Sequence, residues 1–375
     1  MIGIKGNGVP HSSENLTAAG DPATKAAGRI QNFFQKWREL TQDSSILSAI
    51  SGYKIEFLVQ PVQFSVPGPI RFSAEESSNI ALQLTRFLDK GIIKESHHEH
   101  GQVISNIFLR PKKDGTYRMI LNLKELNKFV VFHHFKMDSI HTCTQLMRPG
   151  CYMASVDLQD AYFSIPVHRE HQKYLKFYWN NTLYQFTCLA QGLSSAPRLF
   201  TKIMKPVFAA LRRMGHISSG YLDDSFLVGY TFDECQRNVN DTLTLLEDLG
   251  FLPHKEKSVT SPTQTIHHLG FILNSRDMTI SISDEKYQKL KGVAHGILEQ
   301  AMPTIREVAQ LIGMMVSSLP GVDYGELYFR QIEIEKAAAL RSTHGDFDSS
   351  MQFSGRAKSD ILWWISNALI SKRKN

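Results

Sequence analysis

Three aspartates occupy positions where carboxylates could share divalent cations. Asp223 and Asp224 follow each other between the short segments 217–220 and 225–228, which predicts that both lie at the tip of a hairpin. Asp157 ends another apolar run, where a lone acid is costly to bury unless it binds a partner. If that predicted strand packs beside the hairpin, Asp157 and Asp223 converge. Two carboxylates that hold two hard divalent ions can activate a hydroxyl nucleophile and stabilise a leaving group during in-line displacement.

Each acidic motif also has a simpler interpretation. Adjacent aspartates are common in turns, because their side chains hydrogen-bond to the nearby backbone. Asp157 could instead cap a helix that begins at Gln159. The presence of both motifs in one chain favours the shared cation site.

Helical and extended patterns alternate around these acids, which predicts the α+β class. The β-rich runs 103–109 and 117–123 flank an Asp114-Gly115 pair, which is a good hairpin signal. Ser73 begins a predicted helix that continues to about Leu88. Further predicted elements are a strand at 153–158, a helix at about 195–213 and a hairpin through 220–228.

The pattern beyond Ser283 is wholly helical and predicts a separate unit. Thr304 and Glu307 form a predicted capping box ahead of an apolar helical face. The basic residues of this region are expected to form an ordinary solvated face: Lys286, Lys289, Lys291 and Arg306.

The amino-acid composition says less about the function of the chain than its motifs do. Lys and Arg number 42 against 36 for Asp and Glu, so a polyanionic partner is plausible but not required. The four cysteines are too far apart for any paired metal-ligand spacing. No signal segment opens the chain, and no apolar run approaches the roughly 20 residues of a membrane-spanning helix. We therefore expect an intracellular protein, cytoplasmic or nuclear, with no membrane partner.

A family resemblance joins these motifs. Val156-Asp157 with Tyr162-Phe163, then Gln191-Gly192, then Tyr221-Leu222-Asp223-Asp224, resembles motifs A, B and C of reverse transcriptases in order and spacing. The resemblance extends over about 103–280. The flanks are similar to retrotransposons of the DIRS-like group, relatives of the gypsy-like elements. The resemblance implies an RNA-directed DNA polymerase with a right-hand fold of fingers, palm and thumb, the palm being an antiparallel sheet with helices.

The resemblance also assigns cofactors and partners. Asp157, Asp223 and Asp224 would be the ligands of two Mg²⁺ or Mn²⁺ ions, with Asp224 in a weaker direct role. Lys257 would protonate the departing pyrophosphate. The expected partners are an RNA or DNA template with its primer, and deoxyribonucleoside triphosphates.

Other matched positions would contact the nucleotide or the primer. Lys112, Lys113 and Arg118 suit the triphosphate, because lysine and arginine donate to phosphate oxygens. Tyr162 would block a 2′ hydroxyl by its shape, although it could instead be a core aromatic. The remaining positions are Gln191 and Gly192 beside the nascent base pair, Asp160 through its backbone or as a helix cap, and His268, Leu269 and Gly270 in a primer grip.

The resemblance also gives the expected division of the chain, by segment: a disordered leader (1–28), an N-terminal extension with the start of the fingers (29–102), fingers and palm (103–280), a helical thumb-like region (281–345) and the start of a connection (346–375). Family members usually continue into a ribonuclease H domain, which this chain is expected to lack. Three alternatives remain open at this point: a silent nucleic-acid-binding relative, a two-metal nuclease, and a fragment of a larger polyprotein.

Overall fold

The computed structural model describes residues 26–112, 115 and 117–374, so Lys113 and most of the predicted leader lie outside the described residues. Ala26 is already buried, and the Gly28 N–H donates to the Phe163 carbonyl at 2.8 Å. The packed part of the chain therefore includes residues before Arg29, where order was expected to begin.

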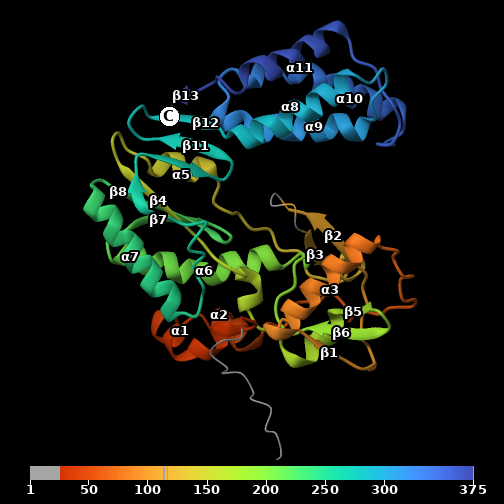
Figure 1. Cartoon of the computed structure of the whole chain (residues 1–375), viewed down its shortest axis with the longest axis vertical. Coiled ribbons are helices and arrows are strands. Elements are labelled where there is room, and N and C mark those ends of the chain that lie inside the picture. The colour runs from red at the N-terminus through yellow and green to blue at the C-terminus, as the bar shows by residue number, and fades with distance from the viewer. Residues whose placement is uncertain (1–25, 113–114, 116, 375) are drawn as a thin grey trace, which may run out of the picture.

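A four-stranded antiparallel sheet with the order β7-β8-β4-β9 lies at the centre of the molecule (Figure 1). Its strands are β4 (Tyr152–Asp157), β7 (Ile217–Tyr221), β8 (Asp224–Gly229) and β9 (Val259–Thr263). The helices α6 (Ala196–Arg213) and α7 (Phe232–Asp248) pack on one face of this sheet. In the register, Asp157 lies opposite Asp224.

The central sheet is buried on both faces, and its side chains alternate between two hydrophobic cores. On β4, Val156 belongs to the first core and Met153 to the second. On β8, Leu227 belongs to the first core, whereas Phe226 and Val228 belong to the second. This alternation follows from the two-residue period of a strand.

A second region surrounds the predicted basic hairpin, which forms as β2 (Ile107–Pro111) and β3 (Tyr117–Leu121). The helix α3 (Ala74–Asp89) begins with a capping box in which the Ser73 N–H donates to Glu76 Oε2 at 2.8 Å. Gln83 on this helix donates to the Tyr117 carbonyl at 2.7 Å and accepts from the Met119 N–H at 2.9 Å. The helix therefore holds the hairpin through one amide.

The remaining elements before residue 200 are short. The strands β1 (Ile93–Glu95), β5 (Lys176–Trp179) and β6 (Thr182–Phe186) form a sheet with the order β1-β6-β5. The short helices are η2 (Arg29–Phe33), α1 (Phe34–Leu40), α2 (Ser44–Gly52), α4 (Lys124–Asn127), α5 (Ile140–Leu146), η3 (Ala161–Ser164) and η4 (Arg169–Tyr174).

The C-terminal region combines a small sheet with a helical bundle. The sheet contains β10 (Thr265–His268), β11 (Phe271–Asn274), β12 (Thr279–Ile282) and β13 (Arg373–Lys374). The bundle contains α8 (Asp284–Leu298), α9 (Ile305–Ser318), η5 (Leu319–Gly321), η6 (Gly325–Leu327), α10 (Arg330–Ser342) and α11 (Gly355–Asn367). The predicted capping box of α9 is confirmed, because the Thr304 N–H donates to Glu307 Oε2 at 2.8 Å. No described helix is long and apolar enough to cross a bilayer.

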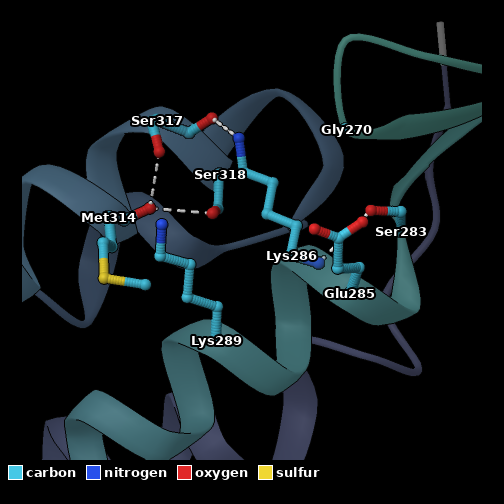
Figure 2. A pocket seen from close by; sticks show the side chains of 8 residues that line it. All are labelled: Gly270, Ser283, Glu285, Lys286, Lys289, Met314, Ser317 and Ser318. Carbon is cyan, nitrogen blue, oxygen red and sulfur yellow. Dashed lines mark hydrogen bonds between the residues drawn. The ribbon is translucent and has the colours of Figure 1, made fainter. Parts of the chain in front are cut away.

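Lys286 corrects the expectation of a purely solvated basic face. Its Nζ donates to the Ser317 carbonyl at 2.8 Å and lies 4.3 Å from the centre of the Phe271 ring. Partial burial lowers the pKa of this lysine. Figure 2 shows Lys286 and Lys289 reaching from α8 toward the last turn of α9, across a cavity of about 270 Å³. Lys286 thus neutralises a helix C-terminus, where carbonyls favour a cation, and joins α8 to α9 and β11.

Candidate active site

A cavity of about 590 Å³ lies between α3, the β2–β3 hairpin, the end of β4, the start of α6 and the tip of the β7–β8 hairpin. Most residues predicted to act in catalysis or nucleotide binding line it together. They are Lys112, Arg118, Asp157, Tyr162, Gln191, Gly192, Asp223 and Lys257. Segments that are distant in sequence thus meet at one cavity.

The β7–β8 hairpin turns through only Leu222 and Asp223, since Tyr221 and Asp224 are already paired. Leu222 has a φ of 55°, in the left-handed region. A non-glycine residue there costs on the order of 1 kcal/mol, so the surrounding structure must hold the turn in place. The strained turn presents Asp223 to the cavity.

Burial and neighbouring charges raise the pKa values of Asp223 and Asp224. The pKa of Asp223 is raised mainly by burial and further by the Asp157 charge, while Arg118 and Lys257 oppose the shift. Burial and the charges of Asp223 and Asp157 raise the pKa of Asp224 to about 7. Buried like charges of this kind favour a bound cation, which would restore the ionised forms.

The donor chemistry fits a hard divalent cation, because every predicted ligand is a carboxylate. Asp157 and Asp223 both line the cavity, whereas Asp224 does not and is hydrogen-bonded to Asp157. Within the described part of the chain, no group of three or more His, Cys, Asp or Glu side chains is assembled as a metal site. Asp157 and Asp223 thus face the cavity together, and the assignment of all three acids as metal ligands stays a prediction.

The segment after α7 is tied directly to Asp157. The His254 N–H donates to the Asp157 carbonyl at 2.8 Å, and the Asp157 N–H donates to Ser258 Oγ at 3.0 Å. These bonds bring Lys257 to the cavity wall, close enough for its charge to lower the pKa of Asp223. Lys255, two residues earlier, does not line the cavity.

Tyr162 lies at the boundary between the cavity and the core. Its ring lines the cavity and also meets Phe200 edge to face, with 5.6 Å between ring centres. Burial, with the Asp223 charge, raises the pKa of Tyr162 to about 12, so its hydroxyl stays protonated. Tyr162 is thus part of the cavity wall and packs against a buried aromatic ring at the same time.

Asp160 does not cap a helix through its side chain, although that was one of its two expected roles. Its φ is 53°, and its Oδ2 lies 2.5 Å from Lys90 Nζ. The ion pair is partly buried at the cavity wall, and it fixes the carboxylate away from the backbone N–H groups that a cap would use.

Gly192 is required by a close backbone approach. Its φ is 107°, and a Cβ built on it would lie 2.4 Å from the Leu121 carbonyl oxygen. Asn127 fixes the turn from the other side, donating to the Gly192 carbonyl and accepting from the Ser194 N–H, each at 2.9 Å. The turn beside the predicted nucleotide site is therefore fastened to the end of β3.

We expect Gly192→Ala to displace this turn and to lower incorporation of nucleotides by roughly tenfold to 100-fold, because misplaced groups lose rate steeply. The clash with backbone and the positive φ should also destabilise the fold by about 1 kcal/mol or more. Primer extension and thermal unfolding measure the two effects. Gly68→Ala is the matched control, since its added Cβ meets no atom within 4 Å. Wild-type activity in Gly192→Ala would contradict the assignment.

The predicted primer grip forms a tight hairpin outside the cavity. Leu269 and Gly270 have φ values of 49° and 81°, the left-handed pair of a two-residue hairpin turn. The His268 side chain is only 6% exposed, and its ring lies 5.1 Å from that of Phe226. A contact through the His268 side chain is therefore not available, and only the turn itself could touch a primer.

Residues 110–273 match the family model described as reverse transcriptase (RNA-dependent DNA polymerase). This segment is a reverse transcriptase domain. The chain is 24% identical over 253 residues to the retrovirus-related Pol polyprotein from transposon opus of Drosophila melanogaster, covering 67% of this chain and 24% of that protein. It is 29% identical over 182 residues to the Gag-Pro-Pol polyprotein of Human T-cell leukemia virus 2, covering 46% and 12%.

The transposon Tf2-3 polyprotein of Schizosaccharomyces pombe is 22% identical over 254 residues, covering 67% of this chain and 19% of that protein. The chain spans about a quarter or less of the length of these curated relatives. The homologues of the reverse transcriptase domain thus include both retroviral and retrotransposon polyproteins.

Solved structures extend the similarity beyond the domain. A foamy viral protease-reverse transcriptase in complex with double-stranded DNA superposes with a TM-score of 0.65 at 17% identity, covering 92% of this chain and 73% of that one. The same enzyme in complex with an RNA/DNA hybrid gives a TM-score of 0.62 at 16% identity, covering 90% and 46%. The predicted α+β, right-hand polymerase fold is confirmed.

Several residues that line the cavity of the reverse transcriptase domain were missed in the sequence. Gln83, Arg86, Phe87 and Lys90 approach the cavity from α3 and its C-terminal end. Their spacing of three, four and seven residues places them on one helix face, which is the signal that could have found them. Gln83 holds the β2–β3 hairpin and Phe87 packs against other aromatic rings. The sequence pattern of this helix face therefore does not by itself distinguish a binding site from a packing surface.

Burial of His268 predicts a pH dependence of stability. Desolvation lowers the pKa of His268 to about 4, below its usual 6.5. The unfolded chain therefore binds the proton more readily, and stability that is complete above pH 6.5 is lost as the pH falls toward 4. The loss is about 3 kcal/mol over that range.

We expect His268→Phe to flatten this dependence. Chemical unfolding measured between pH 7 and 4.5 gives the comparison, and His267→Phe, on the opposite face of the same strand, is the control. An unchanged slope in His268→Phe would contradict the assigned burial.

Proposed function

We propose that this chain is an RNA-directed DNA polymerase that adds deoxyribonucleotides to the 3′ end of a primer. The observation that carries the proposal is the cavity that joins Asp157, at the end of β4, and Asp223, in the β7–β8 turn, with basic residues from the β2–β3 hairpin and with Lys257. Acids alone would serve many hydrolases, and basic residues alone would serve many anion-binding proteins. Their combination around a space of about 590 Å³ suits a triphosphate whose leaving group gains negative charge.

Each residue at the cavity has a role in this proposal. Lys112 and Arg118 bind and orient the triphosphate, and their charges stabilise the departing pyrophosphate. Lys257, beside Asp223, protonates that leaving group. Gln191 and Gly192 hold the nascent base pair, and the ring of Tyr162 occupies the space that a ribose 2′ hydroxyl would need.

Asp157 and Asp223 would hold the cations. Two Mg²⁺ or Mn²⁺ ions bound there would supply the positive charge that lowers the pKa of the primer hydroxyl and stabilises the phosphoryl group in transfer. Asp224, whose pKa is raised to about 7, would add to the site by its hydrogen bond to Asp157. This arrangement makes Asp157 and Asp223 the acids on which activity depends most.

The proposed partners are a template with its primer and deoxyribonucleoside triphosphates. The foamy viral enzyme was solved with double-stranded DNA and with an RNA/DNA hybrid, which supports a duplex partner for this chain. The half-buried Leu269 and the exposed Gly270, at a tight turn, are proposed to touch the primer backbone. The retrotransposon relatives support an origin in such an element, and we propose the DIRS-like or gypsy-like group.

The experiment is primer extension with the purified chain on an oligo-dT primer annealed to poly-rA, with Mg²⁺ or Mn²⁺. We expect the labelled primer to lengthen with deoxythymidine triphosphate and to stay unchanged without a divalent cation. Tight binding of the primer-template without extension would instead identify a silent relative. Release of short labelled fragments would identify a nuclease.

A further inference from the structure

The N-terminal unit, residues 26–55, packs against the segment that carries Tyr162. It comprises η2, α1 and α2, and α1 contacts α6. Figure 1 shows α1 and α2 beside α6, on the side of the molecule opposite the C-terminal bundle. None of residues 26–55 lines the cavity.

A ladder of aromatic rings leads from this unit to Tyr162. Trp37 meets Phe251 at 6.0 Å and 78°, and Phe251 meets Phe200 at 6.0 Å and 66°. Phe200 then meets Tyr162 at 5.6 Å and 80°. The first three rings are at most 1% exposed. Each contact is edge to face, so a shift of one ring is passed to the next in a close-packed interior.

Hydrogen bonds fasten the outer end of the ladder. Trp37 Nε1 donates to the Leu249 carbonyl at 3.0 Å, in the turn that precedes Phe251. The buried Tyr53 hydroxyl donates to Ser195 Oγ at 3.0 Å, at the N-cap of α6. The unit therefore holds both the ladder and the helix that carries Phe200.

The same unit also hydrogen-bonds to the backbone of the segment that follows Tyr162. The Gly28 N–H donates to the carbonyl of Phe163, the residue after Tyr162, at 2.8 Å. The Tyr53 N–H donates to the Pro166 carbonyl at 2.8 Å, and the His168 N–H donates to the Tyr53 carbonyl at 3.0 Å. Backbone hydrogen bonds from Gly28 and Tyr53 thus hold the segment 163–168 at both of its ends.

We propose that the N-terminal unit, through Trp37 and Tyr53, positions the Tyr162 ring and so sets how strongly the site discriminates against ribonucleotides. The proposal rests on the proposed polymerase function for its kinetic consequence. Trp37 and Tyr53 are positioning residues, since neither lines the cavity. Loss of either support would let the ring move.

The first test compares two buried tryptophans. Trp37→Leu removes the outer ring of the ladder, and Trp364→Leu removes an equally buried ring from the C-terminal core. We expect the ratio of kcat/KM for deoxyribonucleotides to that for ribonucleotides to fall roughly tenfold in Trp37→Leu only. The fall should come from easier use of ribonucleotides. An equal change in both variants, or none, overturns the proposal.

A second, more conservative pair of variants tests the proposal even if Trp37→Leu does not fold. Tyr53→Phe removes only the hydroxyl that binds Ser195, and Tyr287→Phe removes a hydroxyl that binds the Ile365 carbonyl at 2.7 Å in the C-terminal core. Both variants lose one hydrogen bond from a buried tyrosine. Selectivity is expected to fall about threefold in Tyr53→Phe and to stay constant in Tyr287→Phe.

A readout independent of activity separates this proposal from the polymerase assignment. In protein labelled with 3-fluorotyrosine, the ¹⁹F resonance of Tyr162 is assigned by its loss in Tyr162→Phe. We expect Trp37→Leu and Tyr53→Phe to shift or broaden it, and Trp364→Leu and Tyr287→Phe to leave it in place. An unmoved resonance in the first two variants refutes the proposal. A wild-type chain that extends no primer counts against the polymerase function alone, because the resonance is still read.

Discussion

Asp223→Asn is expected to lower the rate of deoxyribonucleotide incorporation by roughly 10³-fold or more, with Asp157→Asn giving a similar loss. The amide keeps the size of the side chain but removes the charge that would hold a divalent cation. Binding of the primer-template should stay within a few-fold of wild type, because it depends on basic residues along the duplex. Single-turnover extension and binding of a labelled duplex measure the two quantities separately.

The stability of the same variants distinguishes a functional acid from a structural one. Burial and the Asp157 charge raise the pKa of Asp223, so the ionised carboxylate is held at a cost. Asp223→Asn should therefore unfold at the same temperature as the cation-free wild type or a higher one. Asp241→Asn, a half-exposed acid that pairs with His216, is the control and should keep full activity. Near-normal extension by Asp223→Asn would remove the two-carboxylate assignment.

Tyr162→Val is expected to reduce discrimination between deoxyribonucleotides and ribonucleotides by on the order of 100-fold, while incorporation of deoxyribonucleotides continues. Tyr162 lines the cavity, and the smaller valine would leave space there for a 2′ hydroxyl. The loss should appear as a higher kcat/KM for ribonucleotides, which competing extension reactions measure.

A more conservative substitution of the same residue is the control. Tyr162→Phe keeps the contact with Phe200 and loses only the hydroxyl, so its selectivity should stay near that of wild type. An active Tyr162→Val with an unchanged ratio would make Tyr162 a packing residue alone. A drop in thermal stability without a change in ratio would lead to the same conclusion.

Local signals were sufficient for much of the fold. The helix that begins after Ser73, the Thr304 capping box and the hairpins around 115 and 222 depend on residues a few positions apart, and the structure contains them all. The convergence of Asp157 with Asp223 needed one further assumption, that two predicted strands are neighbours. The order of the motifs along the chain supplied it.

Contacts between distant segments were beyond the reach of such signals. Lys90 and Asp160 pair across the cavity wall although they are 70 residues apart. The burial of His268 depends on which face of β10 packs on Phe226, which strand period alone leaves undecided. The N-terminal unit looked like a flank because its bond from Trp37 to Leu249 spans 212 residues.

Because the side chains of β4 alternate between two cores, packing in both cores determines the position of the acids. A shift of this strand by one residue would place Met153 in the core of Val156 and turn Asp157 away from Asp223, so both cores oppose it at once. Packing on each side of the sheet therefore keeps the acids at their spacing. A single cavity-forming substitution in either core should lower stability, while packing in the other core keeps the acids aligned. Two such substitutions, one in each core, should lower activity far more than the sum of their separate effects.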